Sequence, residues 1–264
     1  NSQGLIEDMQ ILSGDLVSNG DFSQISSELV TNGDFATDSN WFLTQATISN
    51  GKATLSTPDG SYAAVREFNA LVIGKTYLFT IDVDSISSGS ITVGNSGLNI
   101  NSSGIYSGYY VSSSTTAEIK RNTFGSATNA VINSISVKEV GQDWSVTDSD
   151  ANNYIVFNGS AARLKFLNTS PVTQLTSSFV MTAGKKYKLT VDIASVASGV
   201  IKIQNSGINE NFNTPGISTR IINPTGAATL KFLRATANVD ITLNSVSLIE
   251  ITEDTNLPRI DYTG

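Results

Sequence analysis

The sequence predicts an all-β protein made of two tandem β-sandwich domains. Three observations lead to this fold class: an internal repeat with an offset near 110 residues, runs in which apolar and polar residues alternate, and turns rich in Gly, Ser and Asn between those runs. Short strands bounded by such turns are typical of sandwiches and barrels. No segment longer than about two turns shows the apolar stripe of a surface helix.

The internal repeat is the strongest of these signals. The segment that begins Gly74-Lys-Thr-Tyr recurs as Gly184-Lys-Lys-Tyr, 184 − 74 = 110 residues later. The match continues at the same offset through Asn95-Ser-Gly-Leu-Asn and Asn205-Ser-Gly-Ile-Asn. A run of matches at one offset indicates a duplicated domain, and each copy is long enough for two packed sheets.

The central strand of each copy shows the clearest alternation. Apolar residues stand at every second position, with mostly polar residues between them: Tyr77, Phe79, Ile81 and Val83 in the first copy, and Tyr187, Leu189, Val191 and Ile193 in the second. Alternation of this kind predicts a strand with one buried face. Trp41 and Trp144, one near the start of each copy, are predicted to anchor the two cores.

The repeat places the first domain at residues 29–140 and the second at 141–251. Residues 1–28 are expected to be a lead-in segment or the end of a preceding module, and residues 252–264 a linker to a further domain. Apolar residues in the lead-in predict that it packs on a partner chain or on a preceding module: Leu5, Ile6, Met9, Ile11 and Leu12.

A second, shorter duplication lies upstream of the long repeat. Leu16–Phe22 reads LVSNGDF and Leu29–Phe35 reads LVTNGDF. Asn-Gly is first a turn signal, because both residues tolerate positive φ; a calcium or interface role for Asp21 or Asp34 is the alternative. No such segment precedes Trp144, so we expect the first strand of the second domain to be shortened or supplied differently.

Composition excludes several functions. The net charge of −7 and the pI of about 4.6 leave no cationic footprint for nucleic acid. The chain has no His and no Cys, and no carboxylate pair is evident, so the usual bases and nucleophiles are missing. We predict no enzymatic activity, no catalytic residues and no cofactor. No apolar run approaches the roughly 20 residues that cross a bilayer, which predicts no membrane insertion.

Acidic and amide side chains raise the question of a metal site. Asp148, Asp150 and Asn152 begin like a calcium loop, but Asn153 stands where Gly is required and Gly159 where Glu is required. The segment is interpreted as an Asx-rich turn, and no metal site is predicted.

Asp82 and Asp192 occupy matching positions on the polar face of the two central strands. Their recurrence in both copies indicates a role in the fold, and each is predicted to pair with a cross-strand Thr, Ser or Lys.

Differences between the copies point to a candidate ligand site. In the first copy, Tyr106 and Tyr110 flank Gly108 and share a face if this segment is a strand, so the two rings can stack on a sugar or on another subunit. The alternative, which we favour, is that this face belongs to the core and one ring is simply packed. The second copy has Ser218 and Ile222 at these places.

Several motifs resemble carbohydrate-binding-module-like jelly rolls of the galactose-binding type. They are Leu29–Phe35, a Trp several residues later, the central Gly-Lys-x-Tyr-x-x-Thr-x-Asp strand, and the closing Ile135–Val140. Such modules occur in secreted polysaccharide hydrolases and in structural proteins of tailed bacteriophages. Relatives that bind sugar often carry an acidic residue near the closing strand, close to a structural calcium. Here Asn133 and Asn244 hold the comparable positions, so the chain departs from the calcium-binding pattern.

The resemblance implies a structural or attachment module of a phage virion appendage, with glycan-binding ability. The alternative is an accessory carbohydrate-binding module of a secreted bacterial polysaccharide-degrading enzyme. The implied partners are other copies of the chain, neighbouring virion proteins and cell-surface glycans, and the implied location is a virion surface or, alternatively, the secreted fraction. Asn256–Gly264 resembles a connector before lectin-like domains. Two domains on a short connector also predict a rigid spacer.

Overall fold

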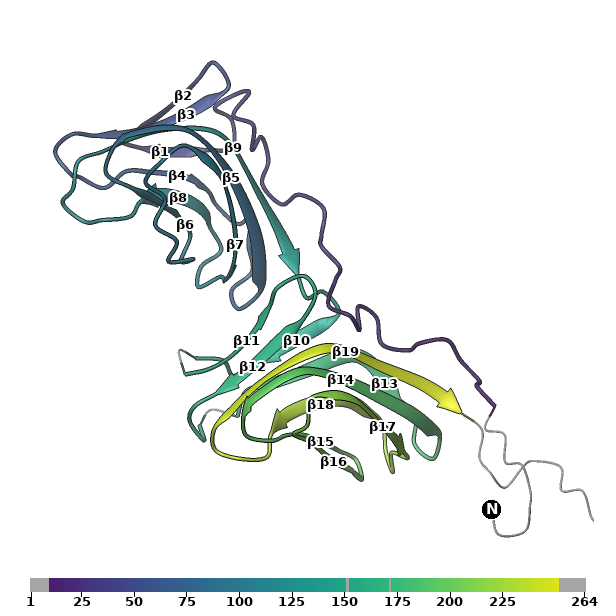
Figure 1. Cartoon of the computed structure of the whole chain (residues 1–264). Helices are drawn as coiled ribbons and strands as arrows, with labels where there is room; N and C mark the ends of the chain where they lie inside the picture. The colour runs from purple at the N-terminus through teal and green to yellow at the C-terminus, as the bar shows by residue number, and fades with distance from the viewer. Residues whose placement is uncertain (1–9, 151, 171, 252–264) are drawn as a thin grey trace, which may run out of the picture. The chain divides into compact units, whose positions relative to one another are not determined.

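The computed structural model describes residues 10–150, 152–170 and 172–251. These residues form nineteen β-strands and no helix, and every strand pairing that the structure defines between them is antiparallel (Figure 1). The predicted all-β fold is confirmed. The expected linker at residues 252–264 lies outside the described residues.

The chain divides into two compact units. The first domain comprises residues 23–142, with which residues 156–159 are grouped. The second domain contains the described residues of three segments, 10–22, 143–155 and 160–251. The expected boundaries are thereby corrected: residues 10–22 belong to the second domain, more than a hundred residues ahead of its main segment.

The first domain consists of two packed sheets. Its larger sheet has the strand order β2-β3-β9-β5-β7 and its smaller sheet the order β1-β4-β8-β6. The strands are β1 (Phe42–Thr44), β2 (Ala46–Ser49), β3 (Lys52–Thr57), β4 (Ala64–Glu67), β5 (Thr76–Ser88), β6 (Ile91–Val93), β7 (Gly104–Val111), β8 (Ala117–Arg121) and β9 (Thr128–Val140).

The second domain repeats this order. Its sheets run β11-β12-β19-β14-β17 and β10-β13-β18-β15-β16. The strands are β10 (Trp144–Thr147), β11 (Asn153–Phe157), β12 (Ala162–Phe166), β13 (Gln174–Met181), β14 (Lys186–Ser198), β15 (Ile201–Asn205), β16 (Ile208–Phe212), β17 (Gly216–Ile222), β18 (Ala228–Arg234) and β19 (Val239–Ile251). Only β16 lacks a counterpart strand, because the first domain has an isolated bridge from Ile91 to Ile100 there. The two tandem jelly-roll sandwiches are therefore copies of one topology.

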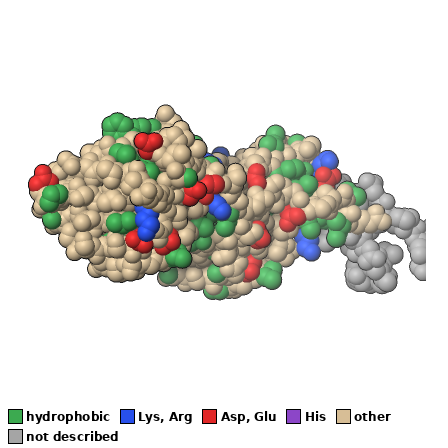
Figure 2. All heavy atoms as spheres, turned by 90° about the horizontal axis from the view of Figure 1, so that it is seen from above, with side chains coloured by type: hydrophobic (Ala, Val, Ile, Leu, Met, Phe, Trp, Pro, Cys, Tyr) green, Lys and Arg blue, Asp and Glu red, His purple; other side chains and the backbone are tan. Residues whose placement is uncertain are grey.

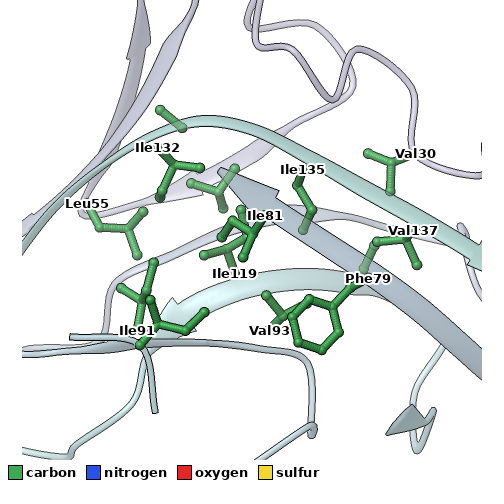
Figure 3. Packing of buried hydrophobic residues seen from close by; sticks show 14 of the residues in the cluster. Val30, Leu55, Phe79, Ile81, Ile91, Val93, Ile119, Ile132, Ile135 and Val137 are labelled. Atoms are coloured by element: carbon green, nitrogen blue, oxygen red, sulfur yellow. The ribbon is translucent and has the colours of Figure 1, made fainter. Parts of the chain in front are cut away.

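The core of the first domain follows from the alternation in its strands. Phe79 and Ile81 of β5 point inward and are fully buried, and they meet Ile119 of β8 from the facing sheet (Figure 3). Burying side chains of this size contributes roughly 1.5–3 kcal/mol each. Val30, which comes from the segment before β1, joins the same core.

Each domain is completed by a short N-terminal segment that we call its clasp. Residues 11–22 form the clasp of the second domain, and residues 25–35 form the clasp of the first. Each clasp lies along the last strand of its domain. It bonds to the part of that strand that the neighbouring strand of the sheet does not pair with. In the first domain β3 pairs with Thr128–Ile132 of β9, whereas the clasp bonds to Ile135–Val140.

The clasp of the second domain is anchored by an aromatic pair and by backbone bonds. Phe22 is fully buried, and its ring centroid lies 5.4 Å from that of Trp144. The indole Nε1 of Trp144 donates to the carbonyl of Asn19 at 3.0 Å, and the N–H of Val246 donates to the carbonyl of Gly20 at 2.8 Å.

The first domain repeats the arrangement. Phe35 lies 5.3 Å from Trp41, whose Nε1 donates to the carbonyl of Asn32 at 3.0 Å, and the N–H of Ile135 donates to the carbonyl of Gly33 at 2.8 Å. Both tryptophans are buried, which confirms them as core anchors. The LVxNGDF duplication thus supplies one clasp to each domain.

A carboxylate bonds each clasp to the last strand. Oδ1 of Asp15 accepts the N–H of Val17 and that of Leu248, both at 3.0 Å. Oε1 of Glu28 accepts the N–H of Val137 at 2.7 Å in the same manner. Bonds from backbone N–H groups to a carboxylate are charge-assisted and stronger than neutral ones, so these two acids stabilise the clasps.

These contacts show that the first domain is inserted within the sequence of the second. Along the chain, the clasp of the second domain comes first, then the clasp of the first domain, then the body of the first domain, and last the body of the second. Ile11 pairs with Ile251 at the outer end of the second clasp, where the purple start of the described chain runs beside the yellow end of β19 (Figure 1). The first strand of the second domain, β10, is in place at Trp144–Thr147, and what the start of the chain supplies is the clasp segment that is missing before Trp144. Leu5, Ile6 and Met9 lie outside the described residues.

Candidate ligand-binding platform

The outer face of the smaller sheet in the first domain carries an exposed aromatic cluster. Phe42 of β1 and Arg66 of β4 are cross-strand partners, and Arg66 faces Glu118 of β8 in the next pairing. Tyr62 and Phe68, which flank β4, complete the group. We call these five residues the platform.

Arg66 holds the three rings of the platform together. Its guanidinium carbon lies 4.9 Å from the ring centroid of Phe42, 5.6 Å from that of Tyr62 and 5.7 Å from that of Phe68. The Phe42 and Phe68 rings are themselves 5.5 Å apart, and these two residues are 52% and 51% exposed. Nη2 of Arg66 donates to Oγ1 of Thr44 at 2.7 Å, which fixes the guanidinium. Cation–π contacts of this kind preorganise the rings.

Tyr62 connects the aromatic group to the charged residues of β8. Its hydroxyl donates to Oε1 of Glu118, while Oε2 of Glu118 lies 2.8 Å from Nζ of Lys120. Burial and this bond to Glu118 raise the pKa of Tyr62 to about 12, so the phenol stays protonated and remains a donor at neutral pH.

A second arginine–aromatic pair lies at the end of β8. Arg121 ends β8 and is only 6% exposed, and its guanidinium carbon is 5.0 Å from the ring centroid of Phe124, a residue that is 92% exposed. The backbone N–H of Arg121 donates to the carbonyl of Ala63, the neighbour of Tyr62. Nη1 of Arg121 donates to the carbonyl of Thr123 at 2.8 Å.

The tyrosine pair predicted from the sequence lies elsewhere and does not form an exposed pair of rings. Tyr110 is 5% exposed and belongs to the core, and burial raises the pKa of its hydroxyl, which has no hydrogen-bond partner among the described residues. Tyr106 is half-buried against the same core, with its hydroxyl 2.7 Å from Oγ of Ser102. A Cβ at Gly108 would lie 2.9 Å from Cε1 of Phe79, so Phe79 fills the space between the rings. The favoured packing interpretation applies, because this face of β7 points inward.

The other acidic positions serve the fold. Asp82 accepts from Nδ2 of Asn133, and Asp192 accepts from Nδ2 of Asn244, both at 3.2 Å. The predicted Thr, Ser or Lys partners are therefore corrected to Asn. Oδ1 of Asp150 accepts two nearby backbone N–H groups, which confirms the Asx-turn interpretation. In the described part of the chain, no cluster of three or more acidic side chains could hold a metal ion.

The second domain does not repeat the platform. By strand pairing, the row Phe42–Arg66–Glu118 corresponds to Ser145–Thr176–Lys231. Tyr62, Arg66 and Phe68 lie two or four residues apart, which is the spacing of one strand face and the signal that the sequence offers for this site. Because β1 and β4 are only three and four residues long, that spacing does not extend into a recognisable alternation.

Charged side chains are otherwise dispersed. On the face of the molecule in Figure 2, acidic and basic side chains alternate with polar surface, and the described residues there form no wide area of one charge. Within the described ranges, no helix is long and apolar enough to cross a membrane.

Comparison with known proteins finds similarity in solved structures only. No family model matches the chain, and no curated protein matches it. The N-terminal CBM22-1–CBM22-2 tandem domain from Paenibacillus barcinonensis Xyn10C aligns at 9% identity over 85% of this chain and 98% of its own, with a TM-score of 0.32. A CBM4 structure aligns at 16% identity over 47% of this chain and 99% of its own, with a TM-score of 0.26. A fucolectin from Morone saxatilis serum aligns at 12% identity over 75% and 85%, with a TM-score of 0.27.

Proposed function

We propose that this chain is a glycan-binding module and that the platform of the first domain is its binding surface. The observation that carries the proposal is the cluster of three partly exposed rings held around Arg66 on one sheet face. Flat apolar rings can stack on the C–H faces of sugars, while nearby polar groups bond the hydroxyls. Carbohydrate-binding modules and a lectin are among the similar structures, but the argument depends on the platform.

Polar groups around the rings suit a hydroxyl-rich ligand. Glu118 can accept and Lys120 can donate hydrogen bonds, and both lie on the outer face of β8, where Glu118 is the cross-strand partner of Arg66. Because Tyr62 and Lys120 already hold the Glu118 carboxylate in place, little side-chain entropy is lost when a ligand bonds to it.

The test is a glycan array with the full chain, followed by titration of the best ligand. Phe42→Ala and Phe68→Ala should each weaken binding severalfold, because an aromatic contact contributes about 0.5–1.5 kcal/mol beyond its area. Ile105→Ala is the matched control, since this exposed apolar residue lies on β7 of the other sheet. Loss of affinity in Ile105→Ala and none in the platform variants would contradict the assignment.

Tyr106→Leu separates the platform from the site expected from the sequence. The substitution removes the ring expected to stack on a sugar and the hydroxyl that bonds Ser102, while it keeps an apolar side chain against the core, so glycan affinity should stay unchanged. A large loss of glycan affinity in this variant would show that the binding site lies on β7.

The setting of the module is a further proposal. A virion appendage and an accessory module of a secreted polysaccharide-degrading enzyme both use a non-catalytic glycan-binding domain, and we infer no catalysis by this chain itself. Self-association, virion partners and the location of the protein belong to the same proposal. Mass spectrometry of purified particles and of secreted enzyme fractions distinguishes the two settings, and release of sugar by the purified chain would contradict the non-catalytic role.

A further inference from the structure

Arg66 in the platform and Arg121 at the end of β8 lack the carboxylate partners that two arginines of the second domain have. In the second domain, Arg163 lies 2.7 Å from Asp240 and Arg220 lies 3.3 Å from Glu210. No ion pair between described residues includes Arg66 or Arg121, although the chain contains 23 acidic and only 16 basic residues. An unpaired arginine in an acidic protein calls for an explanation, because partly buried charges are normally paired.

Hydrogen bonding leaves both guanidinium groups with spare donors. Each has one bond within the described residues, Arg66 to Thr44 and Arg121 to Thr123. Nε of each is buried without a partner. A guanidinium has five N–H donors in a fixed fork, which suits a carboxylate or another planar or tetrahedral anion.

The acids around the two arginines are already engaged. Glu118 faces Arg66 in register, but its oxygens bond Tyr62 and Lys120. Oδ1 of Asp59 accepts from Thr57 and from the N–H of Ser61. Glu67 accepts the N–H of Thr31. No described carboxylate therefore neutralises either guanidinium directly.

Arg66 is the guanidinium that lies within the platform. It contacts the ring of Tyr62 and those of Phe42 and Phe68. Arg121 instead has the two-residue spacing of the core residues Ala117 and Ile119 and contacts Phe124, so it lies on the opposite face of β8 from Glu118.

We propose that the platform binds an acidic glycan, whose carboxylate or sulfate group is bound by the guanidinium of Arg66. This inference rests on the proposed glycan-binding function and adds the chemical class of the ligand. The aromatic rings contact the sugar, and Arg66 selects for the anionic group. Attraction to Arg66 operates locally, because the net negative charge of the rest of the chain is screened beyond about 8 Å at physiological salt.

The experiment measures affinity of the full chain for polygalacturonate, heparin and a neutral galactan, at low and high salt. We expect tighter binding to one or both acidic polymers than to the neutral one, and weaker acidic binding at high salt. The polygalacturonate and heparin arms distinguish carboxylate from sulfate. Arg66→Gln should lower affinity for the acidic polymer at least about tenfold, since hydrogen bonds to charged groups are the strong ones.

Controls separate charge recognition from loss of structure. Arg163→Gln removes the same charge from an ion-paired arginine of the second domain and should leave affinity unchanged. Arg66→Lys keeps the charge but loses the fork, and should fall between wild type and Arg66→Gln. Two results would overturn the acidic-ligand inference and leave glycan binding intact. One is that Arg66→Gln loses affinity equally for neutral and acidic polymers, and the other is that the wild-type chain binds the neutral polymer more tightly. Absence of binding to every polymer overturns both.

Discussion

The two domains share a scaffold and differ on one face. Strand order, the clasp, the Phe–Trp pair and the Asp–Asn bond recur in both. The outer face of the smaller sheet in the first domain carries Phe42, Arg66 and Glu118, whereas the matching row of the second domain is Ser145, Thr176 and Lys231. Residues that persist after duplication therefore maintain the fold, and residues that differ carry the candidate function.

The largest expected effect comes from removing residues 1–22. The second domain should lose its fold while the first domain stays folded, because Phe22 alone is worth about 3–5 kcal/mol as a buried Phe, and a whole domain is typically stable by only about 5–15 kcal/mol. Each domain has one tryptophan, so its fluorescence can follow the unfolding of that domain alone. Trp41→Phe leaves only the fluorescence of Trp144, and Trp144→Phe leaves only that of Trp41.

Matching substitutions in the two clasps test the same comparison between the domains. Phe22→Ala should lower the unfolding midpoint reported by Trp144, and Phe35→Ala that reported by Trp41. An unchanged Trp144 transition after the truncation would show that residues 10–22 are dispensable to the second domain.

A smaller effect is expected from one methyl group at the clasp glycines. A Cβ at Gly20 would lie 2.2 Å from the carbonyl oxygen of Val246, and one at Gly33 would lie 2.1 Å from that of Ile135. Gly20→Ala should destabilise the second domain and Gly33→Ala the first, each by about 1–3 kcal/mol. Gly14→Ala is the control in chemical denaturation, because its Cβ would meet nothing within 4 Å.

The smallest effect is the pH dependence that Asp59 gives to the stability of the first domain. Bonds from the backbone and side chain of Ser61 and from Thr57 lower the pKa of Asp59 from 3.8 to about 2. A lowered pKa contributes stability above the unfolded value, and that contribution is lost as pH falls from about 4 through about 2. Asp59→Asn should lower the Trp41 midpoint slightly at pH 7 and leave it unchanged near pH 2.

The second domain again provides the control, since Asn168 stands at the matching place after β12. Its Trp144 transition should not respond to Asp59→Asn at any pH. A difference between wild type and Asp59→Asn that persists at pH 2 would contradict the assigned role of the carboxylate.

The sequence was sufficient for the fold class because repeats and two-residue alternation are local signals. Tyr77, Phe79 and Ile81 reveal their buried face without knowledge of their neighbours. The clasp was not predictable, because Phe22 and Trp144 are far apart in the chain and only the tertiary contact shows which domain each LVxNGDF segment completes. The platform was missed for the same reason: Phe42, Arg66 and Glu118 come from three strands, one only three residues long.

The pairing of Ile11 with Ile251 sets where the second domain begins to unfold under mechanical tension. Tension applied between residues 10 and 251 would act first on this pair and then on Leu12 and Leu16, which bond Glu250 and Leu248. The clasp would open one bond at a time, as in unzipping, where each rupture needs little load. Until the clasp has peeled away, residues 23–142 lie outside the loaded path. Under tension the chain would thus lengthen by releasing the clasp of the second domain, while the platform of the first domain stays folded.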